Sequence, residues 1–284
     1  PDVVHAHFSA AMFCLALTNR QEGVSYLGTF QGMRFPVLKG PLRWLFKAVE
    51  CFTILRLNQT WVLTEDDFKS VPNFVRKKLA VQEGYGFGCD IDHFDPARFT
   101  DEDKIRKRNE IGIQHNEFVF IFIGRLTAFK GFDLALQAFL RLPEQRSGVH
   151  FIVVGETDSV HPLDLPDLKQ LEGVHAVGWQ SDPAPYLAIA DAMVFPSERE
   201  GMPVCIMEAL AMGVPVITTH ARGCDSLVED GRTGWKVTRD VDSIFAAMRA
   251  STTNQLAVIG EAREEIRKCY ARQHFYRIVE ETLG

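Results

Sequence analysis

The chain has 284 residues, of which 46% are hydrophobic and 24% charged, a balance typical of a globular protein with room for two domains. Its formal net charge of −6 argues against a nucleic-acid binder that relies on a strong positive field, and the sequence has no run of ~18 to 20 uncharged apolar residues that could span a bilayer. The six cysteines form no C-x-x-C pair, which predicts reduced thiols rather than a disulfide or zinc framework.

Short apolar runs separated by helical patterns begin near the N-terminus. The stretch 84–116 is rich in glycine, aspartate and charged residues, which indicates a connection between two α/β halves. Before it, we expect strands at 3–5, 24–29, 61–63 and 78–83, and helices at 8–21 and 41–57.

From residue 117 onward the alternation of strands and helices becomes regular. Strands that are apolar at every position are buried on both faces, which is the mark of a parallel sheet. With helical patterns between them, they favour a doubly wound α/β domain. The whole chain is therefore predicted to form two α/β lobes with a cleft between them. The expected strands here are 118–123, 151–154, 192–195 and 214–218, and the expected helices are 131–142, 183–190, 203–212, 240–250 and 254–268.

Two glutamates, Glu200 and Glu208, stand out because Glu208 is the only charged residue between 201 and 219. Pro203 suits the first position of the helix that holds Glu208, and Gly213 suits its C-cap. The amino end of such a helix is a site for phosphate, and two carboxylates beside it can accept hydrogen bonds from vicinal hydroxyls. The alternative is a surface loop followed by a helix glutamate that faces solvent.

Several motifs follow one another along the chain. They are His5-Ala6-His7, Gly124-Arg125-Leu126 with Lys130-Gly131, Val177-Gly178-Trp179 with Tyr186 and Ala190-Asp191, Pro196-Ser197 with Glu200-Gly201, Pro203 and Glu208-Ala209, and Asp230-Gly231 with Gly234. In this order they resemble the motifs of retaining glycosyltransferases of the GT-B fold, glycosyltransferase family 4 (group 1). The likeness spans nearly the whole chain. It implies two Rossmann-like doubly wound lobes, with the nucleotide sugar bound by the C-terminal one.

The resemblance implies transfer of a hexosyl unit from a nucleoside diphosphate sugar of the UDP or GDP type, with retention at the anomeric carbon and without a cofactor or metal. Arg125 and Lys130 would hold the diphosphate, which suits cations in a loop at the carboxyl edge of an open sheet; solvated loop cations are the alternative. Glu208 would accept from the ribose hydroxyls, and Glu200 would face the donor sugar. Gly201, Met202 and Val204 complete the implied donor site. The implied catalytic set is Glu200, Arg125, Lys130 and His7.

The first lobe departs from the family pattern. His5, Gln31 and Gly32 would lie on the acceptor or sugar side, with core histidines satisfied by backbone as the alternative for His5 and His7. Family members commonly carry histidine where Gln31 stands, and glutamine cannot take up a proton. The chain also opens on what resembles a middle strand, so this lobe is expected to be truncated. Two alternatives are therefore kept: a non-catalytic remnant that binds nucleotide sugars, and an epimerase of the same fold.

Two other features have more than one interpretation. Trp179 either lines the site of the base or is a core tryptophan. The string Asp90-Ile91-Asp92, with Asp95 close by, has the D-x-D form of some metal sites, but its matched position is the connection between the lobes. We therefore expect no metal there. The absence of a G-x-G-x-x-G after any strand argues against a dinucleotide oxidoreductase.

The expected domains are a partial N-terminal lobe over 1–97, a nucleotide-sugar lobe over 98–268, and a helix over 269–284 that returns to the first lobe. The string Arg222-Gly223-Cys224 resembles family members that build bacterial surface polysaccharides on a lipid carrier. We thus expect a cytoplasmic enzyme of polysaccharide or lipopolysaccharide synthesis, with a saccharide or lipid-linked saccharide as acceptor and no nucleic-acid partner. The segment 35–57, which Arg34 precedes, mixes apolar residues with the cations Lys39, Arg43, Lys47 and Arg56. We interpret this segment first as a core helix. The alternative is a helix that lies peripherally on the inner face of the cytoplasmic membrane.

Overall fold

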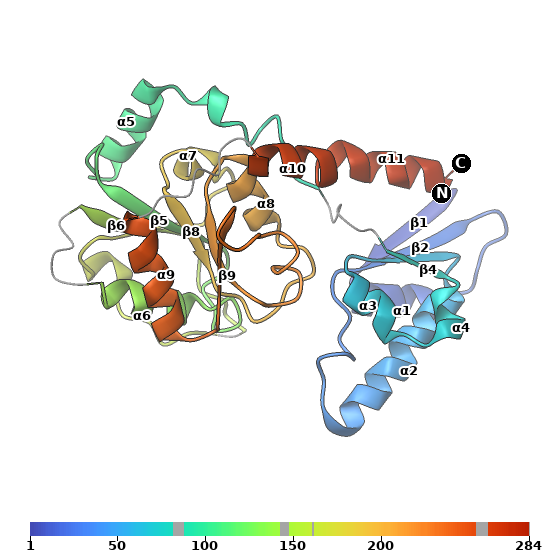
Figure 1. Ribbon diagram of the computed structural model, residues 1–284. Coiled ribbons are helices and arrows are strands. Elements are labelled where there is room, and N and C mark those ends of the chain that lie inside the picture. The colour runs from blue at the N-terminus through green and yellow to red at the C-terminus, as the bar shows by residue number, and fades with distance from the viewer. Residues whose placement is uncertain (82–87, 143–147, 161, 254–260, 284) are drawn as a thin grey trace. The chain divides into compact units, whose positions relative to one another are not determined.

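The computed structural model describes residues 1–81, 88–142, 148–160, 162–253 and 261–283. The chain divides into two compact units (Figure 1). The first comprises Pro1–Phe87, Glu200–Met202 and Gln273–Gly284, and the second comprises Gly88–Arg199 and Pro203–Arg272.

The first unit is built on a parallel sheet in the order β1-β2-β3-β4. Five of the six residues of β2 are buried, because helices pack near this strand. Gly28 permits the close approach of α1, since a Cβ added there would lie 2.5 Å from Met12 Cε. The elements of this unit are β1 (Val3–His7), α1 (Ser9–Leu17), β2 (Ser25–Phe30), α2 (Gly40–Arg56), β3 (Gln59–Val62), α3 (Glu65–Ser70), α4 (Asn73–Arg76) and β4 (Leu79–Val81).

A buried carboxylate fixes the loop that follows β2. Glu50, on α2, is only 1% exposed. Its side chain accepts hydrogen bonds from Ser9 Oγ at 3.0 Å, from the Arg34 N–H at 2.9 Å and from the Phe35 N–H at 3.2 Å. A buried charge is tolerated when several donors satisfy it. One face of α2 is therefore anchored to this unit by polar as well as apolar contacts.

The second unit holds a six-stranded parallel sheet in the order β7-β6-β5-β8-β9-β10. Relative to chain order this is 3-2-1-4-5-6, the doubly wound order whose direction reverses between β5 and β8. Helix α6 packs against α9, and α10 packs against α8 (Figure 1). The strands are β5 (Phe118–Ile123), β6 (Val149–Val154), β7 (Val174–Gly178), β8 (Ala192–Phe195), β9 (Val216–Thr219) and β10 (Gly234–Val237).

Helical segments lie between most consecutive strands of the second unit, and α9 and α10 both follow its last strand. The longer ones of the second unit are α5 (Asp101–Glu110), α6 (Phe132–Leu140), α8 (Val204–Ala211), α9 (Val241–Thr253) and α10 (Glu261–Cys269). The short ones are η1 (Pro96–Arg98), η2 (Leu168–Gln170) and α7 (Ala184–Leu187). The last helix, α11 (Arg272–Leu283), lies almost entirely in the first unit.

The border between the units lies at Phe87/Gly88 instead of 97/98, for a backbone reason. The Cys89 N–H donates to the Tyr270 carbonyl at 2.6 Å, and the Arg272 N–H donates to the Cys89 carbonyl at 2.9 Å. These bonds attach the segment after Gly88 to the second unit.

Two strands and one long helix were missing from the prediction. β7 and β10 are the edge strands of their sheet and are only half-buried at most positions, so they lack an all-apolar run. α5 lies in the stretch predicted as a connection, and it was missed because it carries charged residues on all sides. The sequence feature that indicates this helix is the capping box formed by Thr100 and Asp103. Helix 254–268 was expected, and its first seven residues lie outside the described residues.

Candidate functional site

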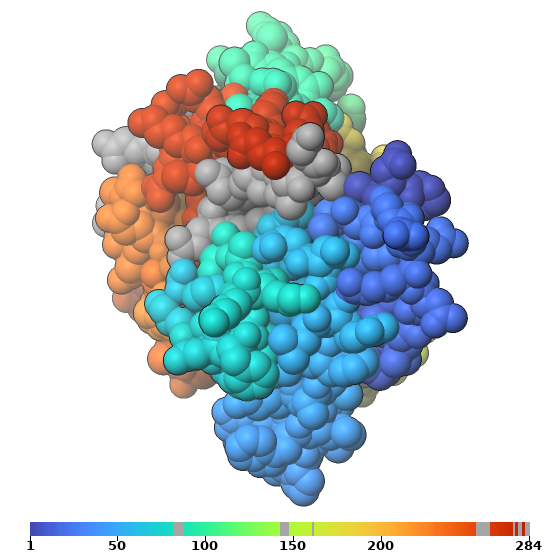
Figure 2. Space-filling view, turned by 90° about the vertical axis from the view of Figure 1, so that its right-hand side faces the viewer, coloured from blue at the N-terminus to red at the C-terminus, as the bar shows by residue number. Residues whose placement is uncertain are grey.

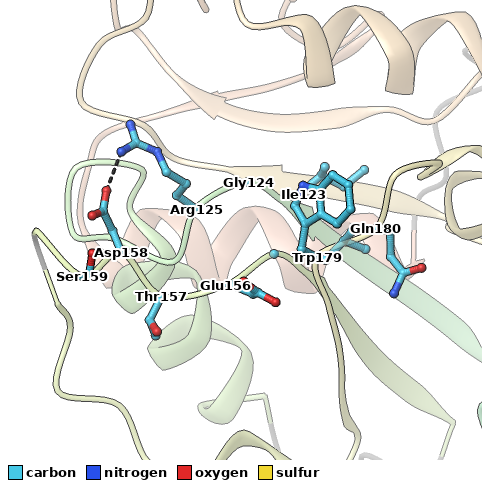
Figure 3. A pocket seen from close by; sticks show the side chains of 11 residues that line it. Ile123, Gly124, Arg125, Glu156, Thr157, Asp158, Ser159, Trp179 and Gln180 are labelled. Carbon is cyan, nitrogen blue, oxygen red and sulfur yellow. Dashed lines mark hydrogen bonds and ion pairs between the residues drawn. The ribbon is translucent and has the colours of Figure 1, made fainter.

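A cavity of about 680 Å³ opens in the second unit where β5, β6 and β7 end (Figure 3). This is the carboxyl edge of the sheet, where open α/β folds bind their ligands. Its walls come from three loops that follow the three strands. The lining residues are Ile123, Gly124, Arg125, Val154, Gly155, Glu156, Thr157, Asp158, Ser159, Trp179 and Gln180.

Two glycines bring the first two loops together. Gly124 and Gly155 have φ values of 152° and 145°, a region that side-chain-bearing residues seldom adopt. A Cβ added at Gly155 would lie 1.9 Å from the Gly124 carbonyl oxygen, so only glycine fits. Beyond this crossing the Leu126 N–H donates to the Glu156 carbonyl at 2.9 Å. The loops therefore run side by side along the cavity.

Arg125 enters the cavity and forms an ion pair with Asp158 (Figure 3). The Arg125 side chain is 65% exposed, whereas that of Asp158 is only 9% exposed. Asp158 is also fixed by the Val160 N–H, which donates to its carboxylate at 2.8 Å. Arg125, which the family resemblance would place on the diphosphate, is thus held at the cavity by the carboxylate of Asp158.

Trp179 and Gln180 form another part of the wall. Trp179 is 68% exposed, so its interpretation as a core tryptophan is wrong. Gln180 is oriented by its amide, which donates to the Val177 carbonyl at 2.8 Å. An exposed indole face beside a fixed amide can take a flat heteroaromatic ring by stacking and hydrogen bonding.

Lys130 lies in the same β5–α6 loop as Arg125 but does not line this cavity. Its ammonium stands 5.4 Å from the centre of the Phe195 ring, the last residue of β8. The turn is fixed by Gly131, which has φ 72° and would place a Cβ 2.2 Å from the Pro196 carbonyl oxygen. Lys130 is therefore held next to the end of β8, at the reversal point of the strand order.

Glu208 is half-buried on α8, so the interpretation of a solvent-facing helix glutamate is wrong. Burial raises its pKa from 4.5 to about 7, although the charges of Arg272 and His93 oppose the shift and that of Asp182 adds to it. His93 in turn bonds Asp182 at 2.8 Å. Glu208 is absent from the lining of the cavity described above. A carboxyl group that titrates near neutral pH is typical of functional sites.

The loop before α8 divides between the two units. Glu200, Gly201 and Met202 fall in the first and Val204, which opens the helix, falls in the second. Pro203 is the N-cap rather than the first helical residue. Met212 is the C-cap instead of Gly213, and Gly213, with φ 76°, is the residue that follows it.

In the first unit, the two histidines of β1 lie together. Their ring centres are 4.2 Å apart, and His5 Nε2 lies 2.8 Å from the Thr29 hydroxyl. Burial, and secondly the neighbouring His7, lowers the pKa of His5 to about 4; burial also lowers that of His7. Both side chains are only half-buried. The hydrogen-bond partner of His5 is the Thr29 side chain, whereas the alternative of a core histidine expected a backbone partner. Gln31 and Gly32, with φ 109° at the glycine, follow β2.

Asp90 of the D-x-D string and the nearby Asp95 form ion pairs with arginines. Asp90 pairs with Arg272 at 3.2 Å and Asp95 pairs with Arg263 at 2.8 Å, while Asp92 is exposed. Within the described part of the chain, no three histidine, cysteine, aspartate or glutamate side chains are grouped so as to hold a metal ion.

Sequence reasoning missed the side chains of the loop after β6 and the glutamine beside Trp179. The available signal was Gly155, which closes an all-apolar strand and therefore places the next residues at the carboxyl edge. The missed residues are Glu156, Thr157, Asp158, Ser159 and Gln180.

Two parallel α/β units, one with the doubly wound order and a cavity at its carboxyl edge, define the GT-B fold. Solved structures agree: that of Anabaena HepE with UDP and glucose superimposes with a TM-score of 0.81, at 18% identity over 99% of this chain and 77% of that one. Sucrose-phosphate synthase from Thermosynechococcus elongatus gives 0.79, at 17% identity over 99% and 73%.

Sequence comparison then gives the family. Residues 117–254 match the model of the group 1 glycosyl transferases. The putative glycosyltransferase EpsD of Bacillus subtilis is 24% identical over 99% of this chain and 74% of its own length. The UDP-Gal:alpha-D-GlcNAc-diphosphoundecaprenol alpha-1,3-galactosyltransferase of Escherichia coli is 25% identical over 90% and 67%. The chain is a glycosyltransferase of the GT-B fold, and its residues 117–254 belong to group 1.

Proposed function

We propose that the chain transfers a hexosyl unit from a nucleoside diphosphate sugar to a saccharide or lipid-linked saccharide, with retention at the anomeric carbon, in the synthesis of a bacterial surface polysaccharide or lipopolysaccharide. The observation that carries the proposal is the β5–α6 loop, which sets Arg125 in the cavity and Lys130 beside the end of β8. The names of relatives support the biological role, since they include enzymes of capsular polysaccharide and lipopolysaccharide core synthesis.

The uridine donor is the more strongly supported of the two types. HepE was solved with UDP-glucose, and the Escherichia coli relative uses UDP-galactose. In our proposal the base lies against Trp179 and the amide of Gln180, and Glu208 accepts hydrogen bonds from the ribose hydroxyls. A base that stacks on an exposed indole needs no rearrangement of the core.

In this reaction Arg125 and Lys130 would stabilise the leaving diphosphate. The bond between the anomeric carbon and the diphosphate oxygen breaks, the acceptor hydroxyl forms the new glycosidic bond on the same face of the sugar, and the proton of that hydroxyl passes to the departing nucleoside diphosphate. Charge-assisted hydrogen bonds from Arg125 and Lys130 would offset the negative charge that develops, each contributing roughly 1.5–3 kcal/mol. We propose that these cations replace a metal ion. Glu200, His7 and Gln31 are proposed to serve the sugar and the acceptor.

We place this reaction in the cytoplasm, on the inner face of the cytoplasmic membrane, because the relative named above acts on a diphosphoundecaprenol-linked sugar. None of the described helices is both long and apolar enough to cross a bilayer.

The test is a transfer assay with UDP- and GDP-hexoses and a polyprenyl-diphosphate-linked N-acetylglucosamine, followed by proton NMR of the product. Retention of the donor's anomeric configuration is expected, and inversion contradicts the proposal. Lys130→Gln should lower the rate by at least about tenfold, whereas Arg141→Gln, an exposed arginine paired with Asp242, should not. Activity should persist in EDTA. Nucleotide binding without transfer would favour the non-catalytic alternative, to which Gln31 already lends support.

A further inference from the structure

Helix α2 has a second apolar face, opposite the one that anchors it. At about 100° per residue, Trp44, Leu45, Ala48, Phe52 and Leu55 fall within an arc of about 100° on one side of the helix. All five are exposed, with Trp44 at 69% and Leu45 at 59%. The helix thus presents to solvent large apolar side chains that a soluble protein normally buries.

The opposite side of α2 accounts for its place in the fold. Glu50, Thr53 and Ile54 are at most 1% exposed and point into the first unit. The outer arc is therefore not needed for the core. Figure 2 shows the amino-terminal half of α2 and the loop before it as a light-blue projection at the lower end of the view.

The charges beside the arc are all positive. At the same 100° per residue, Arg56 lies about 20° beyond one end of the arc, where its Nε donates to the Ala16 carbonyl at 3.2 Å, and Lys47 lies about 60° beyond the other end. Arg43 and Lys39 are at the amino-terminal end of the helix. Lys47 Nζ stands 5.6 Å from the centre of the Trp44 ring, which keeps the cation at the border of the apolar face. The only acidic residue of α2 is Glu50, which is buried and accepts three hydrogen bonds. The outer surface of α2 is thus basic, on a chain whose net charge is −6.

We propose that the outer face of α2 is a docking surface for an anionic lipid bilayer, with Trp44 and Leu45 inserted at the interface and the flanking cations on the lipid phosphates. An amphipathic helix with tryptophan and leucine on one face and lysine and arginine beside it fits this occupant. A second copy of the chain fits less well, because a two-fold contact through this face would set its cations against each other. The inference deepens the proposed function, since it gives an enzyme of lipid-linked acceptors a site at the membrane.

The experiment is flotation with vesicles of phosphatidylcholine alone and with about 30% phosphatidylglycerol. The chain should float only with the anionic vesicles, and less so as salt rises from about 50 to 500 mM, because electrostatic attraction is screened. The variant Trp44→Ser/Leu45→Ser should lower the partition coefficient by at least about tenfold, since two large apolar side chains no longer enter the interface. Arg43→Gln/Lys47→Gln should lower it by roughly tenfold or more.

The matched control is Phe74→Ser, an exposed aromatic residue on α4 that is 64% exposed and lies outside α2; it should float like the wild type. Circular dichroism checks that each variant folds. Flotation that is absent, or that survives Trp44→Ser/Leu45→Ser in the folded chain, overturns the proposal. The proposal is also overturned if the chain binds no vesicles but self-associates, and if Trp44→Ser/Leu45→Ser abolishes that self-association. UDP binding, measured on the same samples, should be unchanged in all α2 variants, which separates failure of this surface from failure of the donor site.

Discussion

The half-buried carboxyl group of Glu208 makes a prediction about stability that can be worked out in sign and size. Its pKa is raised by burial from 4.5 to about 7 in the folded chain. The folded state therefore holds this proton more tightly than the unfolded state. Below pH 4.5 both states are protonated and the group contributes nothing; as the pH rises to 7, deprotonation increasingly disfavours the folded state.

The magnitude follows from the two pKa values. Between about pH 5.5 and 7.5 this single group should lower the free energy of unfolding by about 2 kcal/mol, with a limit of about 3 kcal/mol once the folded state is ionised. Glu208→Gln removes the titration and keeps the shape. The stability of this variant relative to the wild type should therefore rise with pH by about the same 2 kcal/mol. Charged neighbours His93, Asp182 and Arg272 are present in both chains, so the difference isolates Glu208.

The assay is urea unfolding followed by circular dichroism at several pH values. The matched control is Glu110→Gln, whose carboxylate is 52% exposed and paired with Lys107 on the surface of α5; its stability relative to the wild type should stay flat over this pH range. A flat difference for Glu208→Gln, or one that falls with pH, would refute the assignment of a buried, proton-binding carboxyl group at this position.

Three more predictions concern the cavity and its loops. Asp158→Asn should tighten UDP binding by roughly three- to tenfold in calorimetry, because the diphosphate no longer competes with a carboxylate for Arg125; weaker binding would mean that Asp158 positions the arginine instead. Gly131→Ala should lower the free energy of unfolding by at least about 1 kcal/mol more than Gly112→Ala does. Both glycines have positive φ, but only at Gly131 would the added Cβ clash, with the Pro196 carbonyl. Trp179→Ala should weaken UDP binding by roughly tenfold if the base stacks on the indole, and unchanged affinity would place the base elsewhere.

The buried strands of the second unit could be predicted within one or two residues, since local composition alone determines them. β5 and β8, at 118–123 and 192–195, are apolar at every position and have the predicted bounds. β7 could not be found in the same way, because an edge strand keeps one side toward solvent and here includes His175. Whether this segment forms a strand depends on its pairing with β6 in the sheet, and the sequence of the segment alone does not reveal that pairing.

The candidate site divides along the same line. Arg125 and Lys130 are adjacent in sequence to a strand end, so motif and strand prediction together place them at the carboxyl edge. The partner of Arg125 is Asp158, 33 residues away, and it reaches the arginine only because β6 lies beside β5. Likewise, the environment of Glu208 depends on Arg272, which belongs to the last helix. Contacts between loops that follow different strands depend on the order of the strands in the sheet, and local sequence patterns do not predict them.

The most direct test of the account is titration calorimetry of UDP onto the wild type and onto Arg125→Gln, Lys130→Gln and the surface control Arg141→Gln. The account predicts that both loop variants lose at least about tenfold in affinity, because each removes a charge-assisted bond to the diphosphate, and that the control binds as the wild type does. Equal affinity in all four folded chains would contradict the assignment of the diphosphate to the β5–α6 loop.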